Sequence, residues 1–197
     1  MPGQELPQAS CRAHPRGAFA CPGPHTGAEI GSLTERIRDY ERQLETISEE
    51  HYPETDLLRQ VEGVGPLTAL TFVLTLEDPY RFEKSRSVGA YLGLVPARDQ
   101  SGESDPQKRI SKEGDEMLRR LLVGSAHYIL GPFGKDSDLR RHGEKIASRG
   151  GKNSKKRAAV AVARKLSVLL QRLWVSGELY DPLYSTHRRQ EQEEEAA

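Results

Sequence analysis

Apolar residues recur every three or four positions in several stretches of this chain. The spacing is clearest over residues 30–47, 67–74, 117–129 and 159–173, and it is the spacing expected for one face of an α-helix. We find no stretch in which apolar and polar residues alternate as they do in a half-buried strand. The pattern therefore predicts an all-α fold in which a short coiled-coil helix precedes a compact helical domain.

The first helical stretch, residues 29–52, carries a heptad pattern. Its apolar positions follow one another in alternating steps of three and four residues: Ile30, Leu33, Ile37, Tyr40, Leu44 and Ile47. Such a seam is typical of a coiled coil, and Ser32 with Glu35 fits a capping box at the helix start. Because so short a coiled coil is marginal in isolation, two interpretations stay open. The helix is either a coiled-coil stub that joins two copies of the chain or an amphipathic helix folded back on its own domain.

A glycine-rich turn between two helical segments lies within residues 57–70. Gly63 and Gly65 can adopt the positive φ of a tight turn, and Pro66 suits the first position of the next helix. The apolar face of that helix is predicted to comprise Leu67, Leu70, Val73 and Leu74. This is a helix-hairpin-helix pattern, whose uncapped backbone N–H groups can bind a phosphate oxygen. Gly63, Val64 and Gly65 are therefore candidate nucleic-acid-binding residues; the alternative is a Gly-Pro turn that only packs two helices together.

The helical domain is predicted to extend over residues 55–176, with Thr55 or Asp56 capping its first helix. Its further elements are a short helix at 87–92, an exposed polar loop at 97–110, a helix capped by Ser111, a charged helix at 138–149 and a last helix at 154–176 with Gly177 as C-cap. Residues 1–28, rich in Pro and Gly, and the acidic tail 177–197 flank this domain, and we expect both to be disordered.

Charge is unevenly distributed along the chain, although its formal net charge is zero. Residues 108–172 contain 17 Lys and Arg against 6 Asp and Glu, a net charge of +11. A domain with this excess is expected to bind a polyanion such as DNA, with an affinity that falls steeply as salt rises. Since aromatic residues are scarce, contacts with the sugar-phosphate backbone should dominate. The candidate contacts are Lys108, Arg109, Lys112, Arg119, Arg120, Lys152, Lys155, Lys156 and Arg157.

Cysteine usage and hydropathy limit the remaining possibilities. Two cysteines, Cys11 and Cys21, imply no disulfide framework, and we expect a cytoplasmic protein. The longest uncharged run, residues 121–134, is too short to span a bilayer, so no membrane partner is predicted. Cys11, His14, Cys21 and His25 have a loose metal-ligand spacing, but no apolar residues flank them to form a small zinc fold, and we predict no metal site in this chain.

Residues 57 to about 145 resemble the C-terminal domain of the insertion sequence 110/116/902 transposase family. The resemblance is carried by the order and spacing of several short motifs, because the glycine hairpin alone would be a weak signal. These motifs are Val61-Glu62-Gly63-Val64-Gly65-Pro66-Leu67-Thr68-Ala69, Arg81-Phe82, Ala90-Tyr91-Leu92-Gly93-Leu94-Val95-Pro96, Ser101-Gly102, Ile110-Ser111-Lys112-Glu113-Gly114-Asp115 and Leu118-Arg119-Arg120-Leu121-Leu122.

The resemblance implies a DNA recombinase that moves an insertion sequence, guided in some members by a structured RNA. In that family an N-terminal RNase H-like domain binds divalent metal, for which we expect Mg²⁺, and a coiled coil joins it to the helical domain. The helical domain contributes a nucleophilic serine, and by position in the motif that serine is Ser101. It would attack a DNA phosphodiester and form a covalent serine–phosphate link. Glu103 and Asp105, however, follow where the family pattern has small or basic residues.

Residues 1–29 offer only Glu5 and Glu29 as carboxylates, too few for the metal site of the RNase H-like domain. The expectation from sequence is therefore a truncated transposase copy that binds DNA, forms a homo-oligomer through its coiled coil and is inactive alone. The alternatives are a non-catalytic helix-hairpin-helix nucleic-acid-binding module, in which Ser101 is a turn residue, and a decayed product without a selected function.

Overall fold

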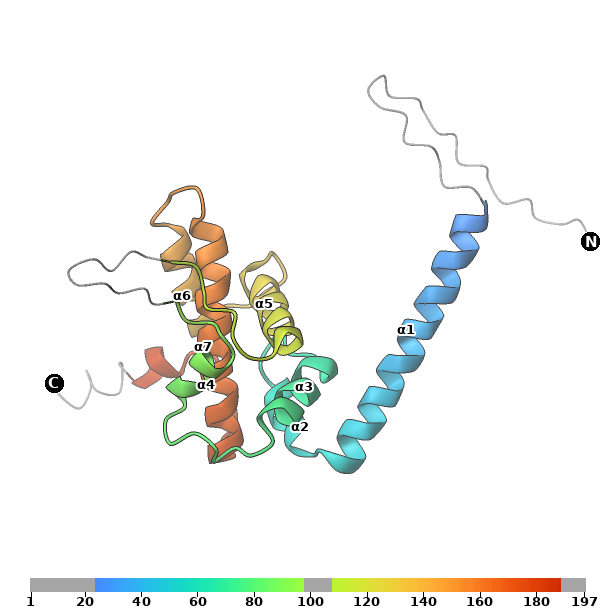
Figure 1. Cartoon of the computed structure of the whole chain (residues 1–197), viewed down its shortest axis with the longest axis horizontal. Helices are drawn as coiled ribbons and strands as arrows, with labels where there is room; N and C mark the ends of the chain where they lie inside the picture. Colours follow the sequence, from blue (N-terminus) through green and yellow to red (C-terminus); the bar gives the residue numbers. More distant parts are fainter. Residues whose placement is uncertain (1–23, 98–107, 189–197) are drawn as a thin grey trace, which may run out of the picture. The chain divides into compact units, whose positions relative to one another are not determined.

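A computed structural model describes residues 24–97 and 108–188 of the chain, with side chains from residue 29 onward. The described residues are all-α, as predicted, and their only strand-like pairing is an isolated antiparallel bridge between Pro96 and Ile110. Figure 1 shows the helices, whose bounds are α1 Pro24–His51, α2 Glu54–Arg59, α3 Pro66–Leu76, α4 Arg86–Tyr91, α5 Glu116–Leu130, α6 Asp138–Ala147 and α7 Ser154–Ser176. The chain divides within α1 into two units, residues 1–39 and residues 40–197.

Helix α7 is the central element of the second unit. It packs against α2, α4, α5 and α6, and the core consists mainly of aliphatic side chains from these helices and α3. Of the seven residues predicted for the packed face of α7, six are buried: Ala159, Val162, Ala163, Leu166, Leu170 and Leu173. The seventh, Leu169, is only partly buried. The ring of Phe72 on α3 meets the ring of Trp174 edge to face, with 6.4 Å between the ring centroids. The buried face of α7 has its alanines in the first half of the helix and most of its leucines in the second half, and four other helices pack against it (Figure 1).

Several helices begin at residues other than those predicted. Helix α1 starts at Pro24, so that Ser32 and Glu35 lie inside it and do not form a capping box. Helix α2 starts at Glu54 without a side-chain cap; the Thr55 hydroxyl instead donates to the carbonyl oxygen of Tyr52 at 2.8 Å. Helix α5 is capped by Asp115, whose carboxylate accepts from the N–H of Leu118 at 2.6 Å, rather than by Ser111.

Helix α3 buries a different face from the one its leucines predicted. Leu70 and Val73 are buried, but Leu67 and Leu74 are exposed to 38% and 49%. Thr68, Ala69, Phe72 and Leu76 complete the buried face. The most apolar helix of the chain therefore keeps part of its apolar surface exposed, because the bulky Phe72 and Leu76 set its orientation against the core.

Ordered structure continues past the predicted domain end at residue 176. The N–H of Tyr180 donates to the side-chain oxygen of Gln60 at 2.9 Å. The carbonyl oxygen of Pro182 accepts from the N–H of Asp138 at 2.8 Å, and the Asp138 carboxylate in turn accepts from the N–H of Ser185 at 2.7 Å. The segment up to residue 188 is thereby fastened across the start of α6; the rest of the predicted acidic tail lies outside the described residues.

No helix in the described ranges is long and apolar enough to cross a membrane.

Candidate nucleic-acid interface

The glycine hairpin joins α2 to α3 through a turn that packs on α5. Gly63 has φ +84°, and a Cβ atom there would come within 3.1 Å of both the Ser125 carbonyl oxygen and the Tyr128 ring. Gly65 has an extended conformation (φ −86°) as the N-cap of α3, and Pro66 occupies the first helical position as predicted. Positive φ is thus needed at one of the two glycines.

The start of α3 has no side-chain cap, as the predicted phosphate site requires. A Cβ atom on Gly65 would meet nothing within 4 Å, so the backbone is open to an approaching ligand there. Val64 is only 5% exposed, so its side chain belongs to the core and only its backbone is available for contact. That this hairpin binds phosphate remains a prediction.

The segment containing Ser101 is held at its two ends by a short backbone stem, formed by residues 93–97 and 109–112. Three hydrogen bonds join the two sides: Ala97 N–H to the Arg109 carbonyl at 2.9 Å, Ser111 N–H to the Val95 carbonyl at 2.9 Å, and Lys112 N–H to the Gly93 carbonyl at 3.1 Å. Ser101 itself lies outside the described residues.

Two glycines allow the backbones at the base of this stem to approach closely. Gly93 and Gly114 have φ +66° and +80°. A Cβ atom on Gly93 would lie 2.2 Å from the Glu113 carbonyl oxygen, and one on Gly114 would lie 2.0 Å from the Tyr91 carbonyl oxygen. Neither position accepts a side chain without movement of the backbone, so the end of α4 and the approach to α5 depend on these glycines.

Arg119 fastens the same junction from α5. Its Nη1 atom donates to the carbonyl oxygens of Leu92 at 3.3 Å, Glu113 at 3.1 Å and Asp115 at 3.4 Å. These carbonyls lie on both sides of the stem. Arg119, predicted as a nucleic-acid contact, is half-buried, and its Nη1 atom is already engaged in hydrogen bonds to backbone carbonyl oxygens.

The other predicted cations are exposed and fall into two groups. Arg109 and Lys112 belong to the stem and Lys108 directly precedes its second side; Lys112 adopts a left-handed conformation with φ +59°. Lys152, Lys155, Lys156 and Arg157 occupy the turn between α6 and α7 and the first turn of α7. Arg120, on α5, lies 3.6 Å from the carboxylate of Glu116 and is 79% exposed.

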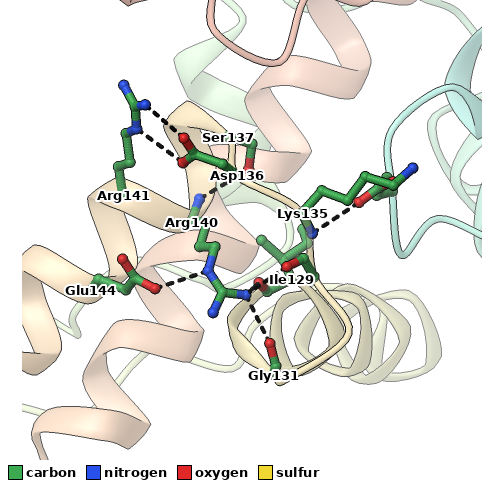
Figure 2. Close-up of polar contacts among 10 residues, drawn as sticks. Ile129, Gly131, Lys135, Asp136, Ser137, Arg140, Arg141 and Glu144 are labelled. Carbon is green, nitrogen blue, oxygen red and sulfur yellow. Dashed lines mark hydrogen bonds and ion pairs between the residues drawn. The ribbon is translucent and has the colours of Figure 1, made fainter.

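A second arginine brace, which the sequence did not reveal, joins α5 to α6 (Figure 2). Nη1 of Arg140 donates to the carbonyl oxygens of Ile129, Gly131 and Gly134 at 2.7–2.9 Å, and its Nε donates to Glu144 at 2.9 Å. A cation is favourable at the C-terminal end of a helix, where carbonyl groups lack partners. Only the Gly-Pro sequence after α5, which leaves such carbonyls exposed, could have suggested this role.

Two exposed ion pairs lie beside this brace (Figure 2). Arg141 forms a bidentate pair with Asp136, at 2.9 and 2.6 Å, and this pairing lowers the pKa of the Asp136 carboxyl. Lys135 pairs with Glu62, and its side chain lowers the pKa of that carboxyl. Basic residues at this end of the domain are therefore paired with carboxylates of the domain itself.

The side chains described from residue 29 onward contain no group of three or more His, Cys, Asp or Glu residues that could hold a metal ion. Cys11, His14 and Cys21 lie outside the described ranges, as does the side chain of His25.

Comparison with known proteins finds sequence similarity to transposases of insertion sequences. Residues 55–140 match the model of the Transposase IS116/IS110/IS902 family. The chain is 33% identical over 153 residues to the transposase for insertion sequence element IS1111A of Coxiella burnetii, an alignment covering 77% of this chain and 41% of that protein. It is 36% identical over 100 residues to the transposase for IS1328 of Yersinia enterocolitica, covering 51% of this chain and 30% of that protein.

A pilin gene-inverting protein of Moraxella lacunata is 28% identical over 111 residues, covering 56% of this chain and 33% of that protein. The chain thus spans about two fifths or less of the length of these relatives. The matches define the class as insertion-sequence transposases. Within that class, residues 55–140 carry the domain of the IS116/IS110/IS902 family.

Proposed function

We propose that this chain forms the DNA-binding, serine-bearing part of a transposase that acts in recombination of an insertion sequence. The observation that carries the proposal is the stem at residues 93–97 and 109–112, which pairs the two sides of the sequence that flank Ser101 and carries exposed cations. A short segment fixed at both ends is a suitable carrier for a nucleophile, since functional side chains are commonly placed on loops held by a rigid scaffold.

Binding is proposed to occur through the sugar-phosphate backbone. The cations at the stem and at the start of α7 are exposed, and a basic surface of this kind contacts phosphates without reading bases. The uncapped start of α3, with Gly63, Val64 and Gly65, is proposed as one further phosphate contact. With 6 to 10 phosphate contacts, affinity should fall roughly 10³–10⁵-fold between 50 and 200 mM salt.

The proposed chemical step is attack by the Ser101 hydroxyl oxygen on a DNA phosphorus atom. A serine–phosphate ester forms and the bond to one deoxyribose oxygen breaks. The serine hydroxyl gives up its proton to solvent, and the leaving oxygen takes one proton from solvent and departs as a hydroxyl. The reverse attack by a different DNA hydroxyl rejoins the strand. Positive charge is needed where the phosphoryl oxygens gain negative charge, and Lys108, Arg109 and Lys112 lie closest to Ser101 in the chain.

A divalent metal, for which Mg²⁺ is the natural candidate, is proposed to act from the RNase H-like domain characteristic of the family. The described residues contain no ligand cluster that fits such an ion. We therefore assign no step in this domain to a metal. A structured guide RNA is proposed as an additional partner on the family resemblance alone.

Self-association is proposed to occur through α1. Four of its predicted seam residues, Ile30, Leu33, Ile37 and Tyr40, are exposed to between 56% and 58%, and Ile47 to 41%. A row of apolar residues at heptad spacing is stabilised when a second helix covers it.

Replacement of the proposed nucleophile tests the catalytic part of this proposal. We expect Ser101→Ala to abolish strand exchange and covalent protein–DNA adducts when the RNase H-like part is supplied in trans. Ser104→Ala, in the same segment, is the matched control and should retain both. Strand exchange that survives Ser101→Ala would leave a non-catalytic nucleic-acid-binding module as the function.

A further inference from the structure

Four basic side chains gather on the surface shared by α6 and α7. His142 and Lys145 lie on α6, and Arg149 follows in the turn after it. The spacing of three residues places His142 and Lys145 on one side of α6. Lys165 comes from α7, and its charge acts on His142 together with those of Lys145 and Arg149. We call these four residues the α6–α7 basic cluster.

The cluster differs from the other basic residues of α6 in having no acidic partner. Arg140 pairs with Glu144 and Arg141 with Asp136. Among residues 24–97 and 108–188, by contrast, no carboxylate forms an ion pair with Lys145, Arg149 or Lys165. The sequence contains no Asp or Glu between Lys145 and Gly177. The repulsion within the cluster is therefore uncompensated, which is the arrangement expected at a surface that meets an external anion.

The pKa of His142 is lowered by its surroundings in the cluster. His142 is half-buried, and burial lowers its pKa below the ordinary 6.5, with the positive charges of Lys165, Arg149 and Lys145 as further causes. The charged groups facing it are Lys165 from α7, Lys145 from its own side of α6 and Arg149 from the turn after α6. In the free protein at neutral pH, the imidazole is thus mainly uncharged. A phosphate group beside the cluster would offset the surrounding positive charge and favour the imidazolium form.

The shape of the cluster favours a polymer over a single phosphate. Positions 142 to 147 span roughly 7.5 Å along the axis of α6 at 1.5 Å per residue, and Arg149 follows two residues beyond the helix end. One DNA strand advances about 3.4 Å along the duplex axis per phosphate. A row of this length faces several consecutive phosphates. The cluster contains no Phe, Tyr or Trp on which a base could stack, so the sugar-phosphate chain is the fitting partner.

We propose that His142, Lys145, Arg149 and Lys165 form a backbone-binding surface for duplex DNA, at which binding takes up a proton on His142. This inference rests on the proposed DNA-binding function and assigns it to a surface separate from the Ser101 stem. No covalent bond changes: solvent supplies the proton, and the imidazolium then donates to or attracts a phosphate oxygen. DNA affinity should therefore rise as pH falls through the pKa of His142 in the complex, and level off below its pKa in the free protein.

The experiment measures binding of the full chain to a fluorescent duplex by anisotropy, over a salt series at pH 8.0 and pH 5.5. We expect Lys145→Gln/Lys165→Gln to weaken binding and to reduce the slope of log K against log salt by about two. The matched control is Lys135→Gln/Arg172→Gln, which removes the same charge from cations already paired with Glu62 and Glu178. This control should retain nearly the full slope.

His142→Gln tests the proton. We expect the wild-type chain to bind more tightly at pH 5.5 than at pH 8.0, about tenfold for each unit by which DNA raises the pKa of His142. The variant should bind with similar affinity at both pH values, and at pH 8.0 its affinity should match that of wild type. Because His142 is half-buried, far-UV circular dichroism checks its fold. An NMR titration of the wild-type imidazole, with and without duplex, gives the pKa difference without any variant.

The outcomes separate this inference from the proposed function. If the wild-type chain binds DNA but Lys145→Gln/Lys165→Gln matches its control, the cluster is no contact surface, and DNA binding occurs elsewhere. If the imidazole pKa is unchanged by duplex, the role of His142 is wrong. A larger loss of affinity for an RNA hairpin than for the duplex would reassign the surface to RNA and overturn the DNA assignment. A wild-type chain that ignores DNA even at low salt would overturn both.

Discussion

At the scale of single residues, backbone geometry rather than side-chain chemistry shapes the junction near the candidate nucleophile. Gly93 and Gly114 allow a close approach of two backbone segments that a Cβ atom would prevent. The guanidinium of Arg119 donates hydrogen bonds to the neighbouring carbonyl oxygens of Leu92 and Glu113. These constraints lie at the ends of α4 and α5, directly beside the stem. Substitutions here should act first on stability and through it on the pairing of the stem.

Gly114→Ala is expected to destabilise the domain by about 3 kcal/mol, since it combines a left-handed φ with a contact of 2.0 Å to the Tyr91 carbonyl oxygen. Gly124→Ala is the matched control. Gly124 lies exposed within α5 with nothing within 4 Å of its Cβ position, and there alanine should stabilise by about 0.5–1 kcal/mol through helix propensity. Urea unfolding of both variants measures the difference; equal stabilities would contradict the close approach at Gly114.

Arg140→Gln is expected to cost about 2 kcal/mol or more, because three carbonyl oxygens after α5 lose a charged donor together. Arg141→Gln, one residue along, removes an exposed pair and should cost much less. The midpoint of urea unfolding checks both. Similar losses for the two variants would show that the carbonyl contacts of Arg140 contribute little.

At the scale of secondary-structure elements, periodicity predicted the existence of the helices better than their ends or orientations. The face of α7 and its Gly177 cap, with φ +68°, were readable because the apolar pattern is long and the capping signal is local. The start of α5 was predicted at Ser111 but lies at Glu116, because Asp115 caps the helix and Ser111 pairs with Val95 in the stem. That pairing joins residues sixteen apart, which no local pattern encodes.

Helix α3 shows the same limit for orientation. Its residues are nearly all apolar, so the sequence gives no polar side from which to read the outward face. Tertiary packing decided it, with Phe72 in the core against Trp174. For the candidate site, the exposed cations could be listed from the sequence. The brace of Arg140 across the end of α5 and the contact of Arg119 with the Leu92 carbonyl depend on how separate elements pack, and could not be predicted.

The exposed seam of α1 leads to a prediction about self-association. Ile37→Glu should shift the chain from dimer toward monomer, because a charge at a seam position must be desolvated when a second helix covers it. Arg38→Glu, at the adjacent position off the seam, changes charge by more and should leave the dimer intact. Light scattering after size-exclusion chromatography gives the mass. An unchanged mass for Ile37→Glu, or a monomeric wild type, would contradict a coiled-coil dimer.

At the scale of the whole molecule, the net charge is zero, but the basic residues fall into two groups, one paired with carboxylates and one in a span without acidic residues. Lys135, Arg140, Arg141 and Arg172 are paired with carboxylates. From Lys145 to Gly177 the chain has no acidic residue, and this span contains the turn between α6 and α7 and the whole of α7. Charge segregation, which the sequence does show, is therefore the most informative global feature for function.

The start of α7 provides a test of whether that segregation serves binding at the expense of stability. Lys155, Lys156 and Arg157 stand in the first turn of a 23-residue helix without an acidic neighbour in that turn. The N-terminal end of a helix carries partial positive charge, so cations there are unfavourable. Lys155→Gln/Lys156→Gln should therefore stabilise the domain at low salt, by about 1 kcal/mol in total, while it weakens DNA binding.

Two measurements on this variant must change in opposite directions. The urea midpoint should rise in low salt and return toward wild type at about 1 M salt, where the Debye length is near 3 Å. The slope of log K for duplex DNA against log salt should fall by about two. Arg36→Gln/Arg38→Gln, with the same charge change inside α1, should alter neither. A variant that is stabilised but binds DNA with the wild-type slope would remove the start of α7 from the interface, because the unfavourable charges would then have no ligand to account for them.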